Sequence, residues 1–334
     1  MPGSTRNIGT RERDRTDALI RARGPPLKYW VGVTNKNWFD FLYARKPEEV
    51  NFWQPSARPL AHALTPGTPF LFKLHSPHNY VVGGGFFVRF SVLPASIAWA
   101  AFGEKNGAGS QNELLGRLGR LARDRVGPGT SIGCNILAEP FFLREKDWIP
   151  IPVDWSPNIV RGKTYDTAER LGAELWTTVA HYLEEEEKET VAAWQQGEDR
   201  AGYGTEYLTR ARLGQGAFRI LVTDAYHRRC AVTGERTLPA LEAAHIKAHS
   251  ESGPNRTDNG LLLRADLHRL FDDGYVTLDD DLRFVVSPRV REEFHNGREY
   301  YHFHGQPLKN LPDTDMERPA REFIHWHNER KFLE

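Results

Sequence analysis

Only two of the 334 residues are cysteines, Cys134 and Cys230. Two thiols cannot build a four-cysteine zinc site, so the sequence predicts no structural zinc finger. One disulfide between them would also be an unusual choice for a chain of this size, and we expect both thiols to be reduced. Reduced thiols are typical of the cytoplasm, which is the compartment that we expect for this protein.

The chain also lacks an excess of charge of either sign and any long apolar run. Its 44 basic side chains are matched by 44 acidic ones, which argues against a protein that coats nucleic acid by bulk electrostatics. Contacts with nucleic acid must then come from local basic patches. No apolar run approaches the length that spans a membrane, and the amino-terminal residues are polar and charged. We therefore expect no membrane partner and no secretory signal.

The length and composition predict a soluble protein with two domains. The 334 residues, 40% hydrophobic and 26% charged, are enough for two separate cores. Runs rich in β-branched and aromatic residues predict strands at residues 29–34, 69–75, 81–91 and 132–137. Helical spacing of apolar residues predicts helices at residues 95–102 and 113–125. This α+β chain divides into a flexible tail at residues 1–25, a β-rich domain at 26–166, a helical linker at 167–202 and a second domain at 203–334.

The most informative part of the sequence is residues 241–272, where His245, Asn259 and His268 follow one another at intervals of 14 and 9 residues. Residues 241–246 predict a strand that projects His245 into a cleft. Turn-prone residues precede Asn259, and residues 261–263 form a second apolar strand or lead into a helix. An asparagine at this place can hold the imidazole in one orientation. Because neutral imidazole accepts a proton near neutral pH, this pattern can place a water-activating base beside a phosphodiester.

His268 and Asp272 are four residues apart, so a helix would bring both side chains onto one face, where they can share a cation. Such a cation can stabilise the charge that develops on phosphodiester oxygens. A mixed nitrogen and oxygen site suits Mg²⁺ or Mn²⁺, with Ni²⁺ and Co²⁺ as further candidates, better than a zinc ion held by thiolates. Glu242 and Asp266 are spare carboxylates nearby in the sequence that can also belong to the site.

Residues 226–277 resemble the HNH endonuclease family, in which two strands and a helix surround one metal ion. The resemblance rests on residues 229–234, 244–246, 259–261 and 267–272. It implies that His245 is the general base, that Asn259 is its orienting partner, and that His268 and Asp272 are metal ligands. Many members of the family carry an acidic or histidine ligand immediately before the base. Ala244 stands there in this chain, so a further ligand must come from elsewhere.

Three aromatic segments stand out in the β-rich domain. Residues 30–38 predict a strand that ends in a polar and aromatic loop. Residues 51–56 predict an aromatic turn, because Pro55 lacks the donor that continuous β structure needs. Residues 70–75 and 81–87 predict a strand pair with close backbone approach at a triple glycine.

This order of strand, aromatic turn and paired strands resembles the PUA superfamily of small β-barrels, in particular its EVE-like and YTH-like members, which hold one base in an aromatic pocket. The resemblance covers about residues 28–163. By position it implies that Trp53 stacks on an extruded base, that Thr34, Asn35 and Gln54 read the base edge, and that Trp38 forms a second wall. Stacking on an indole contributes about 1–3 kcal/mol, which can offset the cost of base flipping. The alternative interpretation is that Trp53 is a core residue.

A base-reading barrel joined to an HNH nuclease resembles a modification-dependent, type IV restriction endonuclease of a prokaryotic cell. The resemblance implies that the first domain flips and reads 5-methylcytosine or 5-hydroxymethylcytosine in double-stranded DNA, and that the second cleaves nearby. Because one HNH site cuts one strand, a double-strand break implies two copies of the chain, as a homodimer or as two molecules on neighbouring marks. Two alternatives stay open. One is a nuclease that reads another mark, phosphorothioate or glucosylated DNA, and the other is a modified-nucleic-acid binding module with an inert nuclease half, which Ala244 favours.

Overall fold

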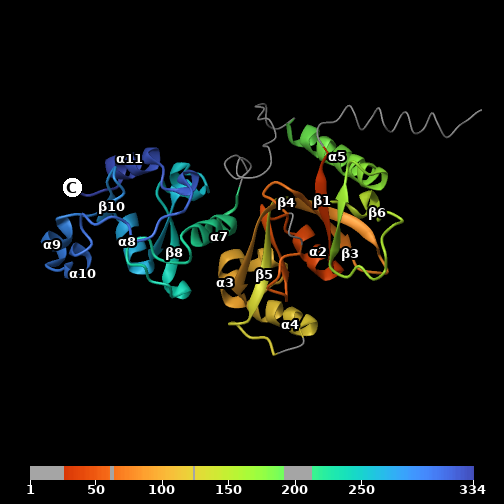
Figure 1. Ribbon diagram of the computed structural model, residues 1–334, viewed down its shortest axis with the longest axis horizontal. Helices are drawn as coiled ribbons and strands as arrows, with labels where there is room; N and C mark the ends of the chain where they lie inside the picture. The colour runs from red at the N-terminus through yellow and green to blue at the C-terminus, as the bar shows by residue number, and fades with distance from the viewer. Residues whose placement is uncertain (1–25, 61–63, 123–124, 192–212) are drawn as a thin grey trace, which may run out of the picture. The chain divides into compact units, whose positions relative to one another are not determined.

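The computed structural model of the chain describes residues 26–60, 64–122, 125–191 and 213–334. They form two compact units. The first consists of the described residues within Met1–Pro47, Pro59–Phe87 and Pro140–Tyr207, and the second of the described residues within Glu48–Arg58, Val88–Glu139 and Leu208–Glu334. Both units combine strands with helices, which confirms the predicted α+β class (Figure 1). The predicted tail at residues 1–25 and the end of the predicted linker, residues 192–202, lie outside the described residues.

The compact units are interleaved along the sequence. The described residues within 48–58 and 88–139, which the sequence groups with the β-rich domain, belong to the same unit as residues 213–334. A boundary drawn on the sequence can only separate contiguous stretches, whereas strand pairing joins segments that lie far apart in the chain. The ranges 26–166 and 203–334 therefore stay a prediction for the domain boundaries.

In the first unit, strand β1 (Lys28–Thr34) is flanked by two partners. It pairs in parallel with β3 (Pro69–Leu74) and antiparallel with β7 (Gly162–Asp166). Strand β3 pairs antiparallel with the first part of β4 (Tyr80–Pro94), which confirms the predicted strand pair, and β4 also pairs with the short β6 (Ile149–Pro150). Helix α2 (Lys36–Tyr43) directly follows β1.

Helix α5 (Arg170–Val191) contributes to the core of the first unit. Its Leu175, Val179 and Leu183 pack with Tyr29 of β1 and Tyr165 of β7. These three apolar residues recur every fourth position, which places them on one face of the helix. The Tyr29 hydroxyl also donates a hydrogen bond of 2.8 Å to the carbonyl of Gly172. The described part of the predicted linker is therefore a helix that packs on strands.

Strand β4 continues into the second unit, where β2 (Glu49–Gln54) pairs antiparallel with β5 (Ser131–Phe142). The strand order is β2-β5-β4-β3-β1-β7, a mixed sheet with β6 beside β4. This path ends at β2 and at β7, so the described strands do not form the closed barrel that the PUA-like resemblance implies. Hydrophobic alternation predicts that a strand exists but not which strands pair, so closure could not follow from the pattern.

The predicted aromatic turn at residues 51–56 is wrong, because Glu49–Gln54 form strand β2 and all six residues are buried. Pro55 follows the last strand residue, so its missing N–H interrupts no pairing. Helix α3 (Ala95–Phe102) confirms the prediction for residues 95–102. Helix α4 (Gln111–Leu121) confirms the second predicted helix over a shorter range, and the 3₁₀ helix η1 (Gly103–Asn106) lies between the two.

The carboxyl-terminal part of the second unit has the predicted strand–strand–helix order. Strand β8 (Leu241–His245) pairs antiparallel with β9 (Gly260–Arg264), and β9 runs directly into helix α8 (Ala265–Asp272). The three consecutive leucines of β9 are all buried, as in a strand that is covered on both faces. They share one core with helix α8 and with helix α7 (Gln215–Ala225).

This part also contains the elements β10 (Val276–Leu278), β11 (Phe284–Val286), α9 (Arg289–Phe294), α10 (Arg298–Tyr301) and α11 (Arg321–Arg330). Helix α11 supports the end of α8 through His327, which is 1% exposed. Its ring stacks on Phe271 at 3.8 Å between centroids, and its Nε2–H donates a hydrogen bond of 3.0 Å to the Phe271 carbonyl. Among the described residues, no helix has both the length and the apolarity needed to cross a membrane.

Burial of His327 predicts a pH dependence of stability. Burial lowers the pKa of His327 from 6.5 to about 4, so the unfolded chain binds a proton in this range that the folded chain does not. The neutral His327 ring therefore contributes fully to the free energy of unfolding above pH 6.5. This contribution falls as the pH drops toward 4, by about 3 kcal/mol in all. We expect urea unfolding at pH 7, 6 and 5 to show this loss, and His327→Gln to remove it. Equal pH slopes in the two proteins would contradict the assignment.

Candidate active site

Strand pairing and a glycine bring His245 against helix α7. His245 is paired with Gly260 of β9, and a Cβ atom on Gly260 would lie only 2.4 Å from Cγ2 of Val222 and 3.1 Å from Cε2 of Phe218. Glycine therefore permits the close approach of α7. The Phe218 ring stacks on the imidazole of His245, with 3.8 Å between centroids and 12° between planes. This stack half-buries the imidazole and fixes its plane.

A hydrogen bond with Asn255 fixes the rotation of the imidazole within that plane. Nε2 of His245 lies 2.8 Å from Oδ1 of Asn255. The amide nitrogen of Asn255 donates to the Leu213 carbonyl at 2.7 Å, so its oxygen faces the ring. An amide oxygen only accepts, and Nε2 therefore carries the proton. In the neutral ring this leaves the lone pair on Nδ1 to accept a proton.

The surroundings keep this imidazole neutral near neutral pH. Burial is the main cause that lowers the pKa of His245, and the nearby His249 and His268 lower it further. The hydrogen bond with Asn255 and the carboxylate of Asp272 act in the opposite direction. A ring with a lowered pKa is available as a proton acceptor. Since two of these influences come from α8, the base and the predicted metal ligands lie within electrostatic range of each other.

Asn259 shapes the loop beside His245. It is fully buried, its Oδ1 accepts from the N–H of Lys247 at 2.8 Å, and its Nδ2 donates to the carbonyls of Lys247 and Pro254 at 3.0 and 2.9 Å. The sequence predicts that Asn259 contacts the imidazole directly, but in the structure Asn255 makes that contact. Asn259 acts one step away, by closing the loop that carries Asn255. Sequence reasoning missed Asn255, because an asparagine after Gly253 and Pro254 looks like an ordinary turn residue.

The structure brings His268 and Asp272 together on α8, as their spacing predicts. Nε2 of His268 lies 3.3 Å from Oδ2 of Asp272, and Nδ1 of His268 lies 2.7 Å from Oε2 of Glu242 on β8. Glu242 thus orients the imidazole from the side opposite Asp272. The other spare carboxylate, Asp266, is bound by Arg264 through two contacts of 2.6 and 2.7 Å, and this pairing satisfies it.

His268 and Asp272 fit a hydrated divalent cation. Their 3.3 Å spacing is near the roughly 3 Å between neighbouring ligands of an octahedral ion with bonds of about 2.1 Å. Burial raises the pKa of Asp272, while the neighbouring His268 opposes that rise. Over the described residues no cluster of three or more histidine, cysteine or acidic side chains is arranged to hold a metal. Two protein ligands suit Mg²⁺ or Mn²⁺, which keep several water molecules.

The side chains of the two predicted base-contacting residues of β2 donate hydrogen bonds to backbone carbonyls of the protein. Trp53 is 9% exposed, and its indole N–H donates to the Asn106 carbonyl at 2.8 Å. The side-chain amide of Gln54 donates to the Ser56 carbonyl at 2.8 Å. Consecutive residues of a strand point to opposite faces of a sheet. Trp53 and Gln54 therefore cannot both present their side chains to one base from this strand.

The other three predicted base-contacting residues lie in the first unit. Thr34 ends β1 and is buried, and Asn35 caps helix α2 by accepting the N–H of Trp38 at 2.8 Å. Trp38 is 3% exposed and meets the edge of Phe72 at 5.2 Å between ring centroids. The Thr34 carbonyl accepts the N–H of His75 at 3.0 Å, so contacts within this unit hold all three residues.

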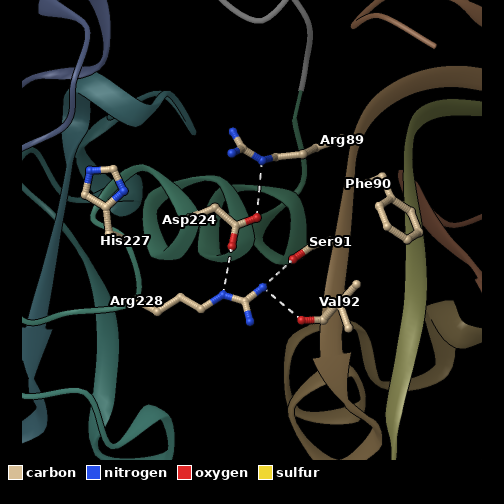
Figure 2. Close-up of a pocket in the computed structure, with 7 residues that line it drawn as sticks. All are labelled: Arg89, Phe90, Ser91, Val92, Asp224, His227 and Arg228. Carbon is tan, nitrogen blue, oxygen red and sulfur yellow. Dashed lines mark hydrogen bonds and ion pairs between the residues drawn. The ribbon is translucent and has the colours of Figure 1, made fainter. Parts of the chain in front are cut away.

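A cleft of about 370 Å³ in the second unit was not predicted from the sequence. It lies between the end of α7 and β4, and Figure 2 shows Asp224 between the guanidinium groups of Arg89 and Arg228. Both arginine Nε atoms lie 3.2 Å from the Asp224 carboxylate. Arg228 follows Asp224 by four residues, but Arg89 lies far from both in the sequence, so no local pattern predicts the cleft.

The metal assignment predicts a difference between two aspartates of α8. Asp272→Asn removes a charged ligand, so we expect the affinity for Mn²⁺ to fall at least tenfold. Asp266→Asn serves as the matched control, because Arg264 already occupies that carboxylate. Mn²⁺ titrations followed by electron paramagnetic resonance measure both affinities. Equal affinity in Asp272→Asn and the unaltered protein would remove Asp272 from the site.

Comparison with known proteins identifies a family for one part of the chain. Residues 230–279 match the HNH endonuclease family. A solved structure titled "Modification dependent TagI restriction endonuclease" is similar at 14% sequence identity and a TM-score of 0.25. The match covers 80% of this chain and 63% of that chain, less than two thirds of its length, and a TM-score of this size does not equate the two folds. No curated protein matches the chain. The chain thus contains an HNH endonuclease domain at residues 230–279.

Proposed function

We propose that this protein hydrolyses DNA phosphodiester bonds with His245 as general base and a divalent cation held by His268 and Asp272. The observation that carries the proposal is the fixed imidazole of His245, whose Nε2–H is bound to Asn255 and whose Nδ1 is left to accept a proton. The pair on α8 lies within electrostatic range of that ring. A base beside a cation site is the arrangement that metal-assisted hydrolysis of a phosphodiester requires.

The side chains of the site divide the reaction between them. A water molecule hydrogen-bonded to Nδ1 of His245 gives its proton to that nitrogen as its oxygen attacks phosphorus. The Asn255 oxygen stabilises the resulting imidazolium through the Nε2–H bond, and the Phe218 stack keeps the ring in place. A bound divalent cation supplies positive charge for the phosphate and leaving oxygens. His268 and Asp272 hold that charge at the start and end of one turn of α8.

We further propose that cleavage depends on a modified cytosine, 5-methylcytosine or 5-hydroxymethylcytosine, that the sheet-containing part of the chain flips and reads. The resemblance of residues 28–163 to EVE-like domains supports this proposal. Trp53, Gln54, Thr34, Asn35 and Trp38 are its candidate contacts. Because Trp53 and Gln54 leave β2 on opposite faces, one base contacts only one of those two side chains. A double-strand break then requires two active sites, and so two copies of the chain.

Removal of the proposed general base, the imidazole of His245, tests the nuclease assignment. We expect His245→Ala to lower the single-turnover rate of DNA cleavage in Mn²⁺ by about 100-fold or more, because proton transfer loses its acceptor. His325→Ala is the control, since His325 is exposed on α11 and paired with Asp280 at 2.7 Å. The rate is measured on a supercoiled plasmid with enzyme in excess. Unchanged cleavage by His245→Ala would refute the catalytic role of this residue.

Plasmids of one sequence with and without methylated cytosine test the dependence on the mark. We expect cleavage of the methylated plasmid and at least a tenfold lower rate on the unmethylated one. Burial of the methyl group contributes about 0.8 kcal/mol, which is less than a tenfold difference in rate requires. Hydrogen bonds to the edge of the modified base must supply the rest. His245→Ala protein identifies any contaminating nuclease. Equal cutting of both plasmids would discard the reading function and leave the hydrolytic assignment intact.

A further inference from the structure

Helix α7 connects two parts of the second unit. Eight of its eleven residues are buried, so it is covered on more than one side. On one side Phe218 and Val222 contact His245 and Gly260 of the HNH strands. On another, Arg219 donates to the Ala100 carbonyl of α3 at 3.2 Å. The helix that carries the stacking partner of His245 is thus also held by an element from residues 88–139.

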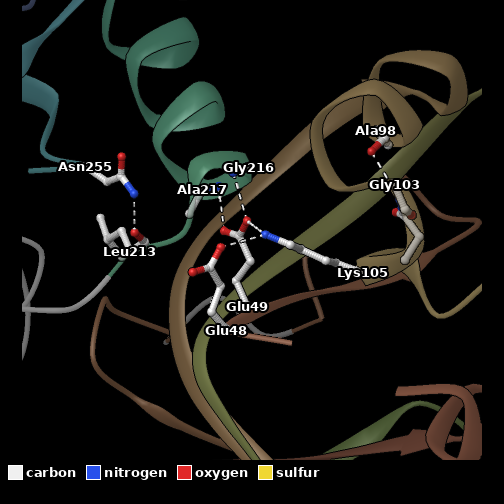
Figure 3. Close-up of polar contacts among 10 residues, drawn as sticks. Glu48, Glu49, Ala98, Gly103, Lys105, Leu213, Gly216, Ala217 and Asn255 are labelled. Atoms are coloured by element: carbon white, nitrogen blue, oxygen red, sulfur yellow. Dashed lines mark hydrogen bonds and ion pairs between the residues drawn. The ribbon is translucent and has the colours of Figure 1, made fainter. Parts of the chain in front are cut away.

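A buried carboxylate anchors the start of α7. The side chain of Glu49 on β2 is fully buried, and its two oxygens accept the N–H groups of Gly216 and Ala217 at 2.8 and 2.7 Å (Figure 3). Lys105 of η1 lies 2.8 Å from Glu49 and neutralises its charge. A carboxylate at a helix amino terminus is favoured by the helix dipole and by two charge-assisted hydrogen bonds. Phe218 is the very next residue of the helix.

The sequence allows this anchor only because Gly216 lacks a side chain. A Cβ atom there would lie 2.7 Å from Cδ1 of Phe102, and 2.8 Å from both the Ala101 carbonyl and the Glu49 carboxylate. Gly214 is closer still to Glu49, with 2.3 Å from its added Cβ to the carboxyl carbon. Any larger residue would push the first turn of α7 away from β2.

A second polar anchor holds the end of α7. Asp224 is 11% exposed and binds Arg89 of β4 and Arg228, each at 3.2 Å. Arg228 in turn donates to the Ser91 hydroxyl and the Val92 carbonyl at 3.2 and 2.8 Å (Figure 2). The helix is therefore fixed at its first turn by β2 and at its last turn by β4.

We propose that Glu49 and Asp224 are positioning residues for cleavage: they fix α7, and through Phe218 they hold the imidazole of His245 in its working orientation. The inference rests on the proposed nuclease function and extends it, because it makes β2, the strand of Trp53 and Gln54, part of the support of the catalytic base. Release of either anchor lets Phe218 shift along the ring. A displacement of about 1 Å at a catalytic group can lower a rate about 100-fold.

Glu49→Gln with Glu48→Gln as its matched control tests the first anchor. Glutamine keeps the volume of Glu49 but loses its charge and one of its two acceptors. Glu48 is 65% exposed, pairs with the same Lys105 at 2.9 Å, and is not a partner of the α7 N–H groups. We expect Glu49→Gln to lower kcat at least tenfold on the plasmid that the unaltered protein cuts, with KM for DNA within about twofold. Glu48→Gln is expected to keep both constants.

Arg89→Gln tests the second anchor and keeps the inference testable if Glu49→Gln does not fold. Arg89 is 37% exposed, so its loss leaves the core intact. A positioning role lowers kcat, whereas a contact of Arg89 with a DNA phosphate would raise KM and reduce the salt dependence of binding. Circular dichroism and thermal melting establish that each variant is folded.

The outcomes separate the inference from the function on which it rests. Folded Glu49→Gln and Arg89→Gln proteins that retain the kcat of the unaltered protein would overturn the positioning role alone. If Arg89→Gln raises KM and leaves kcat unchanged, the positioning role of the second anchor, at Asp224, is overturned. Absence of cleavage by the unaltered protein would overturn the proposed function together with this inference. A fall in kcat at constant KM in both variants, but not in Glu48→Gln, supports it.

Discussion

The contact between the Phe218 ring and the imidazole of His245 is the interaction on which the rest of the site depends. The stack, 3.8 Å between centroids, sets the plane of the ring, and the bond from Nε2 to Asn255 sets its rotation. Together they determine which nitrogen carries the proton. The same contact half-buries the ring and lowers the pKa of His245, so orientation and basicity have one common cause.

The residues around this contact form a supporting layer with separate tasks. Asn259 closes the loop of Asn255 from a fully buried position. Glu242 orients His268 from β8, and His327 holds the end of α8 through the Phe271 carbonyl, next to Asp272. Ala244 precedes His245 in the sequence, and the proposed second ligand, Asp272, lies on the helix that also carries His268, one turn further on.

Local patterns in the sequence were enough to predict the strands and helix of the HNH domain and the pairing of His268 with Asp272. Each of these features depends on residues close together in the chain. Asn255 could not be identified, because its role depends on a loop that folds back onto His245. Trp53 and Pro55 suggested a turn, whereas the ladder with β5 overrides that local tendency.

Features that join residues far apart in the chain could not be predicted from local sequence patterns. The open order of the mixed sheet depends on which strands pair, and alternation carries no such information. The anchors at Glu49 and Asp224 join residues more than 100 positions apart. No sequence pattern identifies Glu49 as a helix cap, because the helix that it caps is distant in the chain.

The tautomer of His245 in solution shows whether its Nδ1 is free to accept a proton from water. Nitrogen-15 NMR of the histidine rings, with His245→Ala used to assign the signal, distinguishes a protonated Nε2 from a protonated Nδ1. We expect a neutral ring at pH 7 that carries its proton on Nε2 and has a pKa below 6.5, the ordinary value for histidine. A proton on Nδ1, or a doubly protonated ring at that pH, would contradict it.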